Sequence, residues 1–400
     1  MHNLILHHCV RNPVQSLLLM CIVSWSTVFF GSQCLAQERG EPGAAAAPYR
    51  ELPVDESLRS KSKFQVNRIL LAGRFADDQE KEVFDEFYKK YALARWSIVK
   101  NRSDLPNFRK ELRNNLRMCG TGGRPPEVHD HLNELTLKYM SGFAGGNFHP
   151  ATRVNAMLMI GELNEKESST SSEPPVPLPA ALMDHLLPTV LNTNQLDAVK
   201  VVALVGIARH GRLGAVDEQT ALSQVAAAMV KLLTSPRPSG KVAEGDAWMR
   251  GQAAEILGML TPMGGNSAVV NALGATIANK ALPFSTRCSA AEALGKLNFR
   301  GAAGMRVAPI LNALRELTLD ACAAEAQIVE RRRLKSRINA VKIAVTGIAK
   351  APGAATAAAI QQPLTTILTV IEDRKLTPDE MMQKVNAEAA KLRGAPSKNP

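Results

Sequence analysis

Aromatic side chains are scarce in this chain of 400 residues, where Phe, Trp and Tyr together make up 4%. This scarcity argues against a β-sandwich and against the aromatic platforms that bind sugars. The 27 glycines are too few for a collagen helix, which needs glycine at every third position. The hydrophobic fraction of 46% is ordinary for a folded protein and argues against intrinsic disorder. The length leaves room for two or three domains with a sizeable core.

The motifs of common catalytic sites are missing as well. The chain contains no HExxH, CxxC, GxSxG or GxxxxGK[S/T] pattern. His129-Asp130-His131, with His149 further on, is the one cluster that suggests a metal. Successive helical residues point about 100° apart, so His129 and His131 do not converge on one ion. We therefore expect no metal, no cofactor and no enzyme activity.

Long apolar runs are confined to the N-terminus. Leu17–Phe30 is mostly apolar, Arg11 precedes it, and Cys34-Leu35-Ala36 matches a cleavage site built from small residues. We predict a signal peptide over residues 1–36, cut after Ala36, and export to the periplasm, the cell envelope or the medium. The alternative is an uncleaved membrane anchor, because the 20 residues from Leu17 to Ala36 are just enough to span a bilayer.

Few cysteines remain after such a cleavage. They are Cys119, Cys288 and Cys322, and an odd number cannot form a complete disulfide framework. We interpret them as buried free thiols that pack as small hydrophobic side chains. A Cys288–Cys322 bridge stays open, since sequence cannot establish one.

Helical periodicity dominates the rest of the chain. Leu222, Val225, Ala226 and Met229 recur at spacings of three and four, which is typical of an amphipathic helix, and no run alternates as a strand would. Phe84 and Tyr88 belong to an aromatic cluster that we assign to the core. The predicted segments are a flexible linker at 37–61, an N-terminal helical cap at 62–148, repeats at 149–373 with a loop at 168–179, and a C-terminal helix with a frayed tail at 374–400.

One pattern occurs in three of the predicted helices. A basic residue is followed by alanine three positions later and by glycine eight positions later. Weaker copies start at Lys200 and Arg337 and lack the glycine, and the starts are 47, 50, 37 and 50 residues apart. These spacings are close to the period of helical-pair repeats, whose units stack because none buries its apolar stripe alone. The full copies are Arg153, Ala156 and Gly161; Arg250, Ala253 and Gly258; Arg287, Ala290 and Gly295.

At these residues the chain resembles the HEAT-repeat family, particularly its short bacterial form. The clearest copies run from Pro150 to Gly161 and from Ser285 to Gly295, and the resemblance covers about residues 149–373. It implies an all-α fold, a right-handed α-solenoid of about five helical pairs with helical caps at both ends. It also implies a structural role for Arg153, Arg250 and Arg287, and a protein that works as a scaffold or binding surface.

Positive charge gathers towards the two ends. The net charge is +11, of which residues 61–148 carry +5 and residues 331–400 carry +8. In segment 89–124, Arg109, Arg113 and Arg117 follow one helix edge, and a second basic run covers 331–337. We name six arginines as a hypothetical site for an anionic partner: Arg109, Arg113, Arg117, Arg331, Arg332 and Arg333. The alternative for both runs is a solvated surface.

Taken together, the sequence predicts an exported, non-enzymatic scaffold that binds another protein. Two alternatives stay open: a binder of an anionic polymer or membrane surface through the basic runs, and an enzyme on the same scaffold. Nucleic acid is not an expected partner, since an exported protein seldom meets it.

Cleavage after Ala36 makes a direct prediction about the N-terminus of the exported protein. Its N-terminal sequence should begin at Gln37. Edman sequencing or mass spectrometry of the protein recovered from the cell envelope measures this. A chain that keeps residues before Gln37 would support the anchor instead.

Overall fold

The structure is a computed structural model, and it describes residues 48–170, 172–214, 216, 219–236, 243–260, 266–299, 306–325, 329–351 and 354–393. The chain divides into two units, Met1–Arg50 and Glu51–Pro400, and every element named below belongs to the second. The predicted signal peptide and most of the predicted linker lie outside the described residues. No helix in the described ranges is long and apolar enough to cross a membrane.

Short helices and two long ones make up the N-terminal part of this unit. Asp77 begins one helix by accepting a hydrogen bond from the Glu80 amide, and Gly73 ends another with a φ of 71°. The first helical turn lies inside the segment that the sequence predicts to be a linker. The elements are α2 (Leu58–Lys61), α3 (Lys63–Ala72), α4 (Asp78–Phe87), the π-helix η1 (Tyr88–Ala92), the 3-10 helices η2 (Ala94–Ser97) and η3 (Val99–Asn101), α5 (Leu105–Gly120) and α6 (Glu127–Gly145).

Aromatic packing holds this N-terminal part together. Phe84 and Tyr88 are fully buried, with ring centroids 4.6 Å apart, and Trp96 is buried with its ring centroid 6.5 Å from that of Phe108. The prediction that the aromatic cluster belongs to the core is therefore confirmed.

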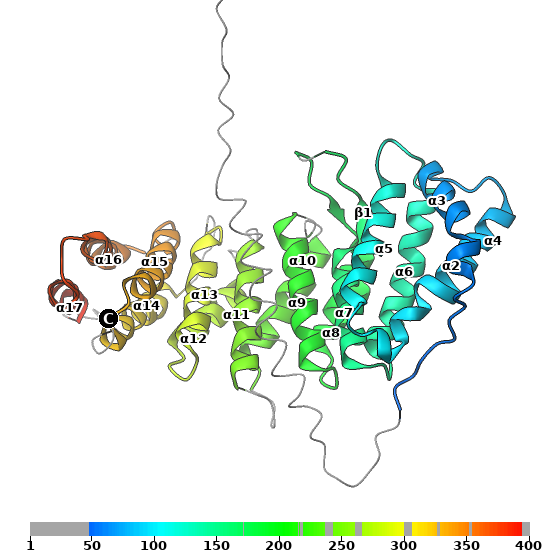
Figure 1. Ribbon diagram of the computed structural model, residues 1–400. Helices are drawn as coiled ribbons and strands as arrows, with labels where there is room; N and C mark the ends of the chain where they lie inside the picture. The colour runs from blue at the N-terminus through cyan, green and yellow to red at the C-terminus, as the bar shows by residue number, and fades with distance from the viewer. Residues whose placement is uncertain are drawn as a thin grey trace, which may run out of the picture. The chain divides into compact units, whose positions relative to one another are not determined.

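Two rows of helices, followed by α16 and α17 at the C-terminal end, form the remainder of the unit (Figure 1). The motif row contains α7, α9, α11, α13 and α15, each packed on the next; the second row contains α8, α10, α12 and α14. This arrangement is an all-α solenoid, as predicted. The bounds are α7 (Pro150–Glu162), η4 (Ala181–Leu186), α8 (Leu187–Leu191), α9 (Asp197–Arg212), α10 (Gln219–Thr234), α11 (Ala243–Met259), α12 (Ser267–Ala278), α13 (Phe284–Lys296), α14 (Val307–Ala324), α15 (Arg331–Ile348), α16 (Ala357–Glu372) and α17 (Pro378–Arg393).

The glycines of the repeated pattern are the points where neighbouring motif-row helices meet. A Cβ atom on Gly258 would lie 2.7 Å from the Ala293 Cα of the next helix, and one on Gly295 would overlap the backbone of Ile343. Ala293 and Ile343 both lie six positions after the basic residue of their own helix, so the contact repeats in register. Backbones at this distance leave no room for a side chain.

The arginines of the pattern satisfy the C-terminal carbonyls of the helix that precedes them. Arg250 donates to the carbonyls of Leu233 (2.5 Å) and Ser235 (2.7 Å) at the end of α10. Arg287 donates to the Ile277 carbonyl (2.8 Å) at the end of α12. Arg153 likewise donates to a carbonyl at the end of α6. These carbonyls lack partners within their own helix, and a cation suits the negative end of the helix dipole.

A small sheet interrupts the helical pattern. Strand β1 (Asn164–Lys166) pairs antiparallel with β2 (Val176–Pro177), with Asn164 opposite Pro177. Strand β2 lies within the segment 168–179 that the sequence predicts to be a loop. Two residue pairs are too short to produce an alternating pattern that sequence analysis could detect.

The close approach at Gly295 predicts a large effect of a single methyl group. Gly295→Ala should lower the free energy of unfolding by about 1–3 kcal/mol, because the new Cβ overlaps the backbone of α15. Gly142→Ala is the matched control: Gly142 lies inside α6, and a Cβ atom added there would have no neighbour within 4 Å, so alanine should be neutral or stabilise by about 0.5–1 kcal/mol. Urea denaturation followed by circular dichroism measures both, and equal effects would contradict the close contact.

Candidate functional site

One side of the motif row is only partly covered, and we call it the open face. From Trp248 onward, the incompletely buried residues of α11 form a single stripe at spacings of four, three and four: Trp248, Gln252, Glu255 and Met259. Neighbouring helices cover the other sides. The Ser289 hydroxyl donates to Glu255 (3.3 Å), which places the stripes of α13 and α11 on the same face.

Two apolar side chains stand out on the open face. Trp248 in α11 and Val205 in α9 are each 40% exposed, although most large apolar side chains of the row are buried. Tryptophan combines a large apolar area with a hydrogen-bond donor, which is why it is common at the centres of protein interfaces. The sequence analysis did not single out either residue, because both have the spacing of ordinary helical positions.

The motif row also carries carboxylates, each with cations nearby. Burial raises the pKa of Glu292 in α13, Lys296 opposes that shift, and the negative charge of Glu255 adds to it. Burial likewise raises the pKa of Glu162 at the end of α7, against the charges of Arg109 and Arg113. A cation from a binding partner would relieve the repulsion between Glu255 and Glu292.

The first predicted basic stripe lies on α5, and two of its three arginines bind groups of the protein itself. Each of the two terminal nitrogens of Arg113 donates a hydrogen bond to the Glu167 carboxylate, at 2.9 and 3.0 Å. Arg109 donates to Asn155 (3.0 Å) and lies 3.5 Å from Glu162. Arg117 is exposed.

The second basic run also serves the fold. Arg331 donates hydrogen bonds to carbonyls at the end of α16, among them that of Asp373 at 2.8 Å. Arg333 forms a bidentate ion pair with Glu325 through two of its nitrogens. Burial acts to raise the pKa of the Glu325 carboxyl, but hydrogen bonds and charge, chiefly from Arg333, hold it below its usual range. Arg332 is exposed. The structure thus brings the six candidate arginines to two separate places and leaves two of them open to solvent.

Glu167 is the centre of a buried polar network that the sequence did not reveal. Its side chain is 2% exposed and accepts hydrogen bonds from Arg113 and from the side-chain amide of Asn164, the latter at 2.9 Å. Burial acts to raise its pKa, but the nearby His129 ring, the hydrogen bonds from Arg113 and Asn164 and the Arg113 charge lower it to about 2. Arg209 of α9 donates to Asn164, so the network joins α5, α6, β1 and α9.

The histidines of the candidate metal cluster point to different partners. His129 lies 3.8 Å from Glu167, His131 is bonded to Asp85 at 2.6 Å, and His149 accepts from the Ala151 amide at the start of α7. In the described ranges no group of three or more His, Cys, Asp or Glu side chains is placed to hold a metal ion.

The described cysteines are free thiols, and Cys288 and Cys322 are not bridged. Burial raises the pKa of the Cys288 thiol to about 11, and it raises that of Cys119 and of Cys322 to about 12. Thiols with such pKa values are poor nucleophiles at neutral pH.

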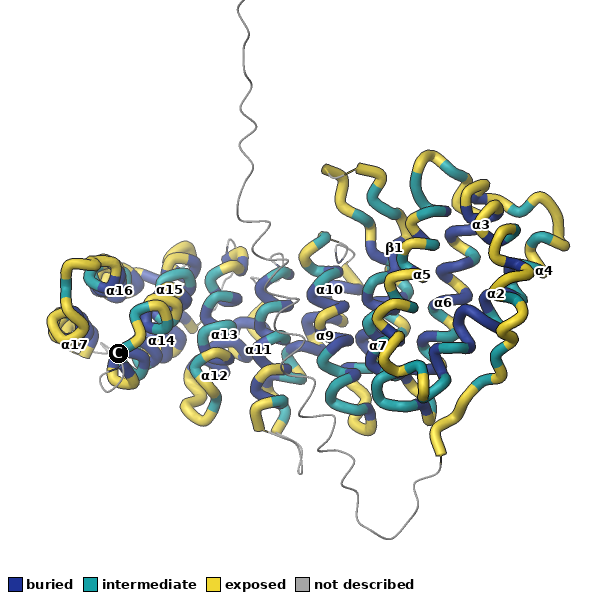
Figure 2. Tube along the Cα trace, in the orientation of Figure 1, coloured by how far each residue is buried: buried dark blue, intermediate teal, exposed yellow. Residues whose placement is uncertain are grey.

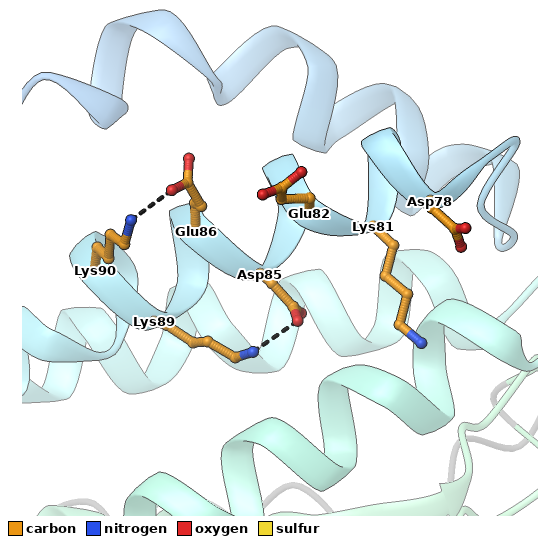
Figure 3. A pocket seen from close by; sticks show the side chains of 7 residues that line it. All are labelled: Asp78, Lys81, Glu82, Asp85, Glu86, Lys89 and Lys90. Carbon is orange, nitrogen blue, oxygen red and sulfur yellow. Dashed lines mark hydrogen bonds and ion pairs between the residues drawn. The ribbon is translucent and has the colours of Figure 1, made fainter.

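Two hollows on the surface are shallow. One follows α4 and η1, where Lys89 pairs with Asp85 and Lys90 with Glu86, so most of its lysines are held by carboxylates of the same helical segment (Figure 3). The other lies between α12 and α14 and is lined mainly by small side chains around Gly274 and Ile310. Neither brings a nucleophile and a base together.

The Glu167 network predicts a pH-dependent contribution to stability. Because the folded-state pKa lies below the ordinary value of 4.5, this contribution is complete above about pH 4.5 and is lost as the pH falls towards 2. Glu167→Gln should therefore lower the free energy of unfolding by up to about 3 kcal/mol at pH 7 and by much less at pH 3. Urea denaturation at both pH values measures this, with exposed Glu165→Gln as the control that should change little. An equal loss at pH 7 and pH 3 would contradict the assignment.

The structure shows an all-α solenoid with an open face, and most of its candidate basic site is occupied by the chain's own groups. No family model, curated protein or solved structure matches this chain. What the chain binds is therefore argued from its own residues.

Proposed function

We propose that this protein is an exported, non-enzymatic scaffold of HEAT-like repeats that binds a protein partner on the open face of its motif row. The observation that carries the proposal is the exposed Trp248 of α11, with Val205 exposed to the same degree on the neighbouring helix. Solenoids of stacked helical pairs offer such continuous faces to extended partners.

The chemistry of the open face indicates what the partner contributes. Trp248 and Val205 favour an apolar side chain, while Glu255 and Glu292 favour a nearby lysine or arginine. A peptide segment or helix that carries both would bury the tryptophan and neutralise the two carboxylates. This pattern favours a protein over an anionic polymer on this face.

The alternative of an anionic partner at the two basic runs has weaker support. Arg113 and Arg333 are each held by a carboxylate through two nitrogens, and a phosphate would have to displace that carboxylate. Arg117 and Arg332 remain exposed, but they lie on α5 and α15, at separate places in the fold. The enzyme alternative gains no support from the hollows.

Export is the second part of the proposal. It rests on the apolar run Leu17–Phe30 and the small residues that end at Ala36. We therefore expect its protein partner to be in the cell envelope.

Replacing Trp248 tests the binding face. In a pull-down from envelope extract, Trp248→Ala should reduce a stoichiometric protein partner by at least about tenfold, since interface tryptophans commonly contribute about 2 kcal/mol or more. The matched control is Leu191→Ala at the end of α8, because Leu191 is also 40% exposed but belongs to the second row. Equal recovery with both variants, or no partner with the unaltered chain, would overturn the proposal.

A further inference from the structure

The helix α3, near the start of the solenoid, leaves part of its apolar surface uncovered. Its buried side contains Val66, Ile69 and Leu70, as an amphipathic helix requires. On its opposite side Phe64 is 84% exposed and Leu71 is 54% exposed. These two residues are seven positions apart, which places them two turns apart on one side of the helix, about 10 Å along its axis.

The last helix of the chain shows how such a surface is normally covered. Helix α17 buries Met381, Val385 and Leu392 and exposes mostly polar residues, so it seals its end of the solenoid (Figure 2). A terminal helix with a polar outer side keeps a solenoid soluble. Helix α3 departs from that rule at Phe64 and Leu71.

Basic side chains accompany the uncovered pair along residues 58–74, and carboxylates of the adjacent α4 neutralise part of that charge. Residues 58–74 contain five Lys or Arg and no Asp or Glu. All five are exposed, and Arg68 also pairs with Glu80 of α4. The five are Arg59, Lys61, Lys63, Arg68 and Arg74.

We propose that this side of α3 docks on an anionic membrane surface, with Phe64 and Leu71 entering the boundary between headgroups and acyl chains. Helices that lie in the membrane plane combine Phe or Leu on one side with flanking Lys and Arg that contact acidic headgroups. Two apolar side chains suffice for such shallow insertion, whereas a protein interface of standard size uses roughly 20–30 residues per partner. The inference concerns a different surface from the open face and does not depend on a protein partner there.

Hydroxyl-radical footprinting of the full chain tests the proposal at single residues. With vesicles of phosphatidylcholine and phosphatidylglycerol, the oxidation rate of Phe64 should fall at least about threefold, because insertion removes most of the water from a side chain that is 84% exposed. Vesicles of phosphatidylcholine alone should leave the rate unchanged. Trp248, on the open face, is the internal reference and should be oxidised at the same rate throughout.

This readout separates docking by α3 from attachment through residues 17–30, since attachment alone leaves Phe64 exposed to radicals. The double variant Lys61→Gln, Lys63→Gln should weaken the protection of Phe64. The control is the double variant Lys375→Gln, Lys384→Gln at the other end of the solenoid, which should leave that protection unchanged. An unchanged rate at Phe64 with anionic vesicles would overturn the proposal. Equal protection of Phe64 by neutral vesicles, or equal protection of Trp248, would overturn it too. Protection that grows with protein concentration in the absence of lipid would also overturn it, because it would indicate that a second copy of the chain covers α3.

Discussion

Neighbouring helices of the motif row touch through their backbones, and the rest of the solenoid depends on that contact. Gly258 lies against Ala293 and Gly295 against Ile343, at distances that exclude any side chain on the glycine. Close backbone contact fixes the spacing within the motif row. The arginines of the same pattern join that row to the second one, because Arg250 and Arg287 satisfy the carbonyls at the ends of α10 and α12.

Several charged residues hold distant parts of this protein together. Glu325 is fully buried between two arginines of α15, and Glu167 is held by Arg113. Removing one partner of such a buried pair leaves an uncompensated charge, so these pairs fix one arrangement of the chain rather than offer a binding surface. The basic excess of the sequence is therefore a weaker guide to partners than the few apolar side chains that remain exposed.

The two surfaces proposed as docking sites differ in chemistry. The open face combines Trp248 with Glu255 and Glu292, whereas Phe64 and Leu71 of α3 lie among the five Lys and Arg of residues 58–74. The first suits a protein segment with apolar and basic side chains, and the second suits an acidic lipid surface. A scaffold that used both would present a protein partner close to a membrane.

Local spacing in the sequence determined the helical class and the repeated pattern, because each of these depends on residues within one or two turns. That helices meet at the glycines of the pattern depends on the neighbouring helix, so only the tertiary structure decided it. Sequence could not show that Arg113 faces Glu167, which lies 54 residues further along, or that Arg333 and Arg337 enclose Glu325. Nor could it show that Phe64 and Trp248 stay exposed while Phe84 and Trp96 are buried, since all four occupy ordinary helical positions. The tertiary structure decided those points, because pairing and burial depend on which distant helix packs on each face.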